Sequence, residues 1–98
     1  MKSISADELE RRLASREAPF LLDVRERNEM PDGVIAGSVN IPMGEVEHRL
    51  GELPTDRDIV VICHLGARSG YIAKRLVTLG YERALNLSGG LDAWFRAK

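Results

Sequence analysis

The sequence contains a single cysteine, Cys63, and only two histidines among its 98 residues. A lone thiol cannot form a disulfide within the chain, and one cysteine with two histidines cannot complete the ligand set of a closed structural zinc site. We therefore predict no metal and no cofactor. Cys63 then either packs in the core as a small apolar side chain or carries out chemistry.

The chain also lacks an excess of charge of either sign. Its 14 Lys and Arg residues against 15 Asp and Glu residues leave a net charge of −1, so we expect neither nucleic acid nor an anionic membrane as a partner. The longest apolar run, residues 59–63, is far shorter than the roughly 20 residues that a membrane helix needs. The first five residues contain no apolar signal core, which leads us to expect a cytoplasmic protein.

The amino-acid composition is that of a folded globular protein. Hydrophobic residues make up 44% of the chain and charged residues 30%, which disfavours a disordered chain. A chain of 98 residues is long enough for one compact core and too short for two. We therefore predict a single domain that spans residues 1–98.

Short apolar runs alternate with helical patterns along the chain. Strands are predicted at residues 20–24, 38–41, 59–62 and 84–87. Helices are predicted at residues 6–16, at 43–53, between loop 64–68 and Gly80, and after Gly90, with a loop at 28–37. This alternation implies parallel strands joined by crossover helices, which is an α/β sandwich with helices on both faces of the sheet.

The most informative segment surrounds Cys63. The thiol lies at the carboxyl end of the most apolar strand, where α/β proteins collect their sites. The loop that follows opens a helix, whose N-terminal amides and dipole favour an anion. Gly66 allows the loop to curl so that its N–H groups point inward, and Arg68 adds a positive charge. These features predict a lowered pKa for the thiol and a nucleophilic role for Cys63 at neutral pH.

Four separated blocks of the sequence, which together run through most of the chain, resemble the rhodanese family of sulfurtransferases. They are residues 21–25, which contain Asp23 and Arg25, residues 33–42, residues 63–69, and residues 87–94. The sequence departs from the family pattern at Met30, Val34 and Ala36, where the family usually has an aromatic residue, histidine and proline. The resemblance implies a three-layer α/β/α sandwich around a central, mainly parallel sheet of about five short strands.

The resemblance also implies a reaction. Cys63 would take the outer sulfur of a donor such as thiosulfate, become a persulfide, and pass the sulfur to a thiol, cyanide or protein acceptor. A persulfide-carrying protein is a second class of donor. The backbone of the active loop would stabilise the terminal sulfur anion, Arg68 would orient the donor, and Asp23 and Arg25 would support the loop. The active loop consists of Cys63, His64, Leu65, Gly66, Ala67, Arg68 and Ser69.

Three other functions are compatible with this pattern. The domain could relay sulfur between proteins without turnover of thiosulfate, or serve as a protein-interaction module, although retention of Cys63 argues against the latter. A cysteine-dependent phosphatase or arsenate reductase is the third, but four residues separate Cys63 from Arg68, and related phosphatases have a longer loop there. His64 is a candidate general acid or donor ligand, whereas His48 lies off the apolar stripe of its helix and is predicted to be solvated.

Overall fold

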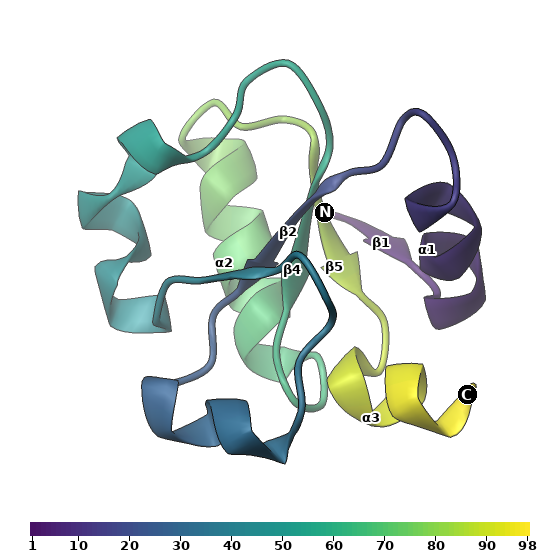
Figure 1. Ribbon diagram of the computed structural model, residues 1–98. Coiled ribbons are helices and arrows are strands. Elements are labelled where there is room, and N and C mark those ends of the chain that lie inside the picture. Colours follow the sequence, from purple (N-terminus) through teal and green to yellow (C-terminus); the bar gives the residue numbers. More distant parts are fainter.

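A computed structural model describes residues 1–98 and contains one five-stranded parallel sheet (Figure 1). The strands are paired in the order β1-β5-β4-β2-β3. Their bounds are β1 (Lys2–Ile4), β2 (Phe20–Asp23), β3 (Val39–Asn40), β4 (Ile59–Ile62) and β5 (Ala84–Leu87). The α-helices are α1 (Ala6–Leu13), α2 (Ala67–Thr78) and α3 (Gly90–Arg96), and the 3-10 helices are η1 (Arg27–Asp32), η2 (Met43–His48) and η3 (Leu50–Glu52).

The central strand β4 separates two apolar cores. All four of its side chains are buried, and they alternate between the faces because successive residues of a strand point in opposite directions. Ile59 and Val61 join the core beneath α2 and η2, whereas Val60 and Ile62 join the core beneath α1 and α3. Helices therefore cover both faces of the sheet, which confirms the predicted three-layer sandwich (Figure 1).

The predicted and observed elements agree best where short apolar runs define strands. The bounds of β4 and β5 match the prediction, and the side chain of Ser5 caps α1 by accepting a hydrogen bond from the Glu8 amide at 3.1 Å. Helix α1 nevertheless ends at Leu13, three residues before the predicted end at Arg16. The helix ends early because no fully buried side chain follows Leu9, so packing does not stabilise a further turn.

The prediction of one helix over residues 43–53 was wrong. The segment forms two 3-10 helices, η2 and η3, which are interrupted at Arg49. The apolar side chains of Met43 and Val46, and those of Leu50 and Leu53, are three residues apart, a spacing that suits a 3-10 helix as well as an α-helix. A glycine in each half further lowers the α-helical propensity.

The first strand was not predicted at all. Strand β1 has three residues, of which only Ile4 is buried, so it carries no alternating pattern to recognise. Its position depends on the parallel pairing of Lys2 with Leu85 at the other end of the chain. None of the helices combines the length and the apolar character that crossing a membrane requires.

The parallel strands place their carboxyl ends along one edge of the sheet. In Figure 1 this edge carries η1, the loop between β4 and α2, and the start of α3. Three segments that are distant in the sequence therefore meet around Cys63.

Candidate active site

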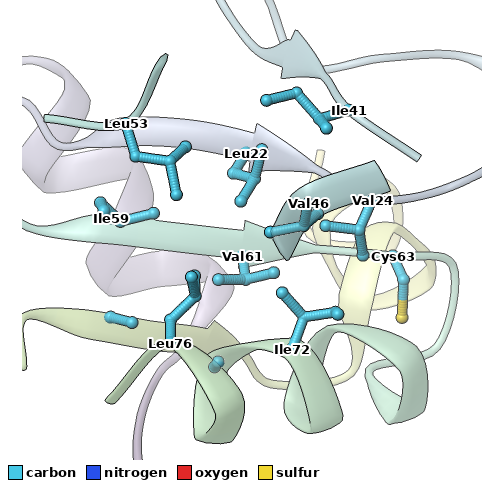
Figure 2. Packing of buried hydrophobic residues seen from close by; sticks show 12 residues of the cluster. Leu22, Val24, Ile41, Val46, Leu53, Ile59, Val61, Cys63, Ile72 and Leu76 are labelled. Carbon is cyan, nitrogen blue, oxygen red and sulfur yellow. The ribbon is translucent and has the colours of Figure 1, made fainter. Parts of the chain in front are cut away.

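Cys63 is delivered by β4 into a protected position. Cys63 is 1% exposed and belongs to the core cluster on the α2 face of the sheet. Figure 2 shows its sulfur just beyond the end of β4, next to the apolar side chains of Val24 and Ile72. The thiol is free, because the chain has no other cysteine.

Two hydrogen-bond donors of the active loop lie within hydrogen-bonding distance of the sulfur of Cys63. The Gly66 amide donates at 3.0 Å, and the Ser69 hydroxyl lies 3.3 Å away on the first turn of α2. Gly66 has φ +104°, a conformation that a residue with a Cβ rarely adopts, and this turn directs its N–H at the sulfur. The sequence predicted this curled loop for the same reason.

The surroundings of Cys63 act on its pKa in opposite directions. Burial raises the pKa of the thiol, because the charged form loses contact with water. Hydrogen bonds from the Ser69 hydroxyl and from the amides of Ser69, Gly66 and Leu65 lower it and outweigh burial, so the net pKa lies below the ordinary value. The groups that lower the pKa of Cys63 are thus the Ser69 hydroxyl and the loop's backbone amides. The prediction from the sequence also included the positive charge of Arg68.

Asn86 on β5 links the two halves of the loop. Its Oδ1 accepts from the Ser69 hydroxyl at 2.6 Å, and its Nδ2 donates to the Gly66 carbonyl at 3.3 Å. Because Ser69 has one O–H, it donates either to Asn86 or to Cys63 at a given moment. Asn86 was not predicted from the sequence, although an amide in a strand of apolar residues is a recognisable signal.

Replacing Ser69 with alanine will raise the pKa of Cys63, because it removes the hydroxyl that stabilises the thiolate. A hydrogen bond to a charged group contributes about 1.5 to 3 kcal/mol, so persulfide formation at pH 7 should slow roughly tenfold. The ultraviolet absorbance of the thiolate, followed against pH, measures the shift. Ser38→Ala, in the loop before β3, is the matched control. If the thiol of Cys63 titrates unchanged in Ser69→Ala, the Ser69 hydroxyl donates to Asn86 alone.

Two backbone amides at the start of α3 donate hydrogen bonds to the active loop. The Leu91 amide donates to the Cys63 carbonyl at 2.9 Å, and the Asp92 amide donates to the His64 carbonyl at 3.0 Å. This close approach requires a glycine at position 90, since a Cβ there would lie 2.5 Å from both carbonyl oxygens. Packing against the active loop therefore explains Gly90, the second glycine of the fourth resembling block, whereas a Cβ at Gly89 would meet the side chain of Ala93 at 2.7 Å.

Gly90→Ala will destabilise the protein by about 2 to 3 kcal/mol, because the new methyl group clashes with backbone at φ +61°. Gly37→Ala separates the clash from the strain. Gly37 also has a positive φ, +86°, but nothing lies within 4 Å of its Cβ position, so only about 1 kcal/mol should be lost. Urea unfolding of both variants makes the comparison, and equal losses would contradict the proposed contact.

Asp23 and Arg25 form a buried ion pair at the end of β2. Their side chains are 1% and 3% exposed, and the Arg25 guanidinium donates to both carboxylate oxygens of Asp23. Arg25 also donates to the carbonyls of Glu29 at 3.2 Å and Gly33 at 2.8 Å. The pair thereby holds η1 and the loop that follows it, and its support of the active loop stays a prediction.

The remaining residues of the active loop differ in exposure. His64, Leu65 and Ala67 are exposed, and Arg68 is partly exposed with its guanidinium bound to Glu29. His64 lines a cavity of about 400 Å³ between η1 and α3.

His48 is exposed on η2, as predicted. No cluster of three or more His, Cys, Asp or Glu side chains is arranged to hold a metal ion.

The fold and this site together define a class of protein: a parallel α/β sandwich with a cysteine at the carboxyl end of its central strand, inside a loop of inward-facing hydrogen-bond donors. The family model of the Rhodanese-like domain matches residues 5–97, and the chain belongs to this family.

Three similar proteins illustrate the relationship. A protein of Allochromatium vinosum named "Sulfurtransferase" is 40% identical over 96 residues, which cover 98% of this chain and 90% of the relative. The structure of the human single-domain sulfurtransferase TSTD1 aligns with a TM-score of 0.91 at 28% identity, covering 100% of this chain and 98% of the human one. A Bacillus subtilis protein named "Putative sulfur carrier protein YrkF" is 37% identical over 91 residues, which cover 93% of this chain and 49% of that protein. These names support sulfurtransferase activity in general.

Proposed function

We propose that this chain is a sulfurtransferase in which Cys63 carries the transferred sulfur as a persulfide. The observation that carries the proposal is the set of donors aimed at one sulfur atom, with the Gly66 amide at 3.0 Å and the Ser69 hydroxyl at 3.3 Å. Donors placed in this way stabilise a sulfur anion before and after the transfer. The pKa of Cys63 is lowered by the same groups, against the effect of burial.

The reaction consists of two displacements. The Cys63 thiolate attacks the outer sulfur of a donor such as thiosulfate, the donor's S–S bond breaks, and sulfite leaves with the electron pair. Cys63 then carries a persulfide anion, which the amides of residues 64–69 would stabilise. An acceptor such as cyanide attacks the terminal sulfur, the S–S bond of the persulfide breaks, and thiocyanate leaves while the thiolate is restored. Both steps balance without an oxidant or a reductant.

The acceptor must come from outside the chain. With one cysteine, the protein cannot discharge its persulfide by forming an internal disulfide. We therefore propose a thiol, cyanide or the cysteine of another protein as the acceptor. A cytoplasmic location suits this chemistry, because the reducing compartment keeps a thiol free.

A sulfur-relay domain is the second candidate, and the sulfur carrier among the relatives favours it. A relay would use the same persulfide but would receive and pass its sulfur only within protein complexes. Multiple turnover with small molecules therefore discriminates between the two functions.

The experiment that tests the proposal is intact-mass measurement after incubation with excess thiosulfate. We expect a gain in mass of one sulfur atom that disappears when cyanide is added, with release of thiocyanate. A protein that gains no sulfur from thiosulfate or from an organic persulfide would refute the proposal. Cysteine-dependent hydrolysis of a phosphate ester would favour a phosphatase instead.

A further inference from the structure

The guanidinium of Arg68, the positive charge of the active loop, is bound to a carboxylate. In the first turn of α2, Arg68 directs its guanidinium at Glu29, which lies 39 residues earlier in η1. Nη1 donates to Oε1 at 2.7 Å and Nη2 donates to Oε2 at 3.0 Å, so the pair has the two-point geometry of a strong ion pair. The positive charge that the loop would otherwise offer to an anion is cancelled by a carboxylate.

Glu29 is itself held in place. Its Oε1 accepts a second hydrogen bond from the Glu26 amide at 3.0 Å, and its carbonyl accepts from the Arg25 guanidinium at 3.2 Å. The hydrogen bond from Arg68 holds the pKa of Glu29 at about 2, well below its ordinary value. The carboxylate therefore stays ionised at neutral pH and remains beside the active loop.

The other guanidinium groups at this edge of the sheet are paired as well. Arg25 is bound to Asp23 at 2.8 Å, and Arg96 is bound to Asp92 at 2.8 Å. Both arginines line the cavity next to the active loop. The ionisable side chains that line this cavity without forming an ion pair are His64 and Asp32.

We propose that the preferred sulfur donor is a persulfide carried on an organic thiol, and that Glu29 determines this preference against inorganic dianions such as thiosulfate. The inference rests on the proposed sulfur transfer through Cys63. An inorganic dianion would enter the loop whole, next to a carboxylate that repels it and with no unpaired guanidinium to bind it. An organic persulfide presents only its outer sulfur, while the rest of the donor stays outside the loop.

The transfer from such a donor is balanced. The Cys63 thiolate attacks the outer sulfur of R–S–SH, and the S–S bond of the donor breaks. The thiolate R–S⁻ leaves with the electron pair, and Cys63 keeps the outer sulfur and its proton as a hydropersulfide. No charge beyond that of one thiolate has to be bound in the loop, so the amide donors suffice.

The test compares two donors, thiosulfate and cysteine persulfide, in wild type and in Glu29→Gln. The glutamine keeps the size of the side chain but leaves the guanidinium of Arg68 with its charge uncompensated. The measured quantity is the ratio of kcat/KM for thiosulfate to kcat/KM for cysteine persulfide, which cancels a general loss of activity. We expect wild type to favour cysteine persulfide, and Glu29→Gln to raise the ratio about tenfold through a lower KM for thiosulfate.

Glu47→Gln is the matched control. Glu47 also binds a guanidinium at two points, that of Arg75 farther along α2, through Nε at 3.0 Å and Nη2 at 2.9 Å, so its loss should leave the ratio unchanged. A ratio that stays constant in Glu29→Gln, or a wild type that favours thiosulfate, would overturn the inference while leaving sulfur transfer intact. A wild type that forms no persulfide with either donor would overturn both.

Ionic strength gives a readout that needs no variant. In wild type, kcat/KM for thiosulfate should stay level or rise with added salt, because no free cation attracts the dianion. In Glu29→Gln it should fall with salt, since the freed guanidinium then attracts the donor. A steep fall with salt in wild type would contradict the proposal.

Discussion

Replacing Cys63 with serine will reduce sulfur transfer to the rate of the reaction without protein. A serine hydroxyl does not ionise at neutral pH and forms no persulfide, so the first displacement has no nucleophile. The measurements are thiocyanate release from thiosulfate and cyanide, and the intact mass of the protein after incubation with the donor. Because the chain has no other cysteine, a covalent sulfur adduct on wild type can be assigned without mapping.

The stability of Cys63→Ser must be measured beside its activity, because the site is 1% exposed. The serine hydroxyl can accept the hydrogen bond that the Gly66 amide gives to sulfur, so we expect a loss of only about 1 kcal/mol. Circular dichroism and urea unfolding show whether the fold is retained. A folded variant that still acquires one sulfur atom would disprove the role of Cys63.

Replacing Arg25 with methionine will destabilise the protein by about 3 to 5 kcal/mol, because it leaves the buried carboxylate of Asp23 without its partner. Two carbonyls, those of Glu29 and Gly33, lose a donor at the same time. A loss of this size is a large part of the roughly 5 to 15 kcal/mol that stabilises a typical domain. The midpoint and slope of urea unfolding give the loss in free energy of unfolding. A loss below about 1 kcal/mol would show that the buried pair contributes no more than a surface ion pair.

A second variant distinguishes the cost of an unpaired charge from the loss of packing. In the double variant Asp23→Asn with Arg25→Met, no buried charge remains, so we expect part of the stability lost in Arg25→Met to return. The position of η1 depends on Arg25, and η1 carries Glu29, so the single variant should also loosen the ion pair with Arg68. Further loss in the double variant would contradict this account.

The sequence is most informative where a short segment decides the structure. The run 59–62 is apolar throughout and is buried on both faces, so its strand and the position of Cys63 follow from the segment alone. Strand β1 could not be predicted, because its one buried side chain, Ile4, gains its place only through pairing with β5. The turns of η2 and η3 were misassigned, because apolar residues three apart fit two kinds of helix.

The same distinction holds for the candidate site. Gly66 and Ser69 lie within six residues of Cys63, so local reasoning could place them in the loop. Glu29 and Asn86 reach the loop from η1 and β5, 39 residues before Arg68 and 17 after Ser69. Glu29 is not unusual for its charged segment, and although Asn86 is the one polar residue of β5, only the folded chain brings either side chain to the loop.

The pairing of β1 with β5 also has a consequence for how the protein folds during synthesis. These strands join residues 2–4 to residues 85–87, so the sheet cannot be completed until residues 85–87 have left the ribosome. Until then, β4 lacks its neighbour β5 on one side, and the residues of β1 have no strand to pair with. Because contacts between distant residues slow folding, we expect nascent chains that lack residues 84–98 to remain unfolded and dependent on chaperones.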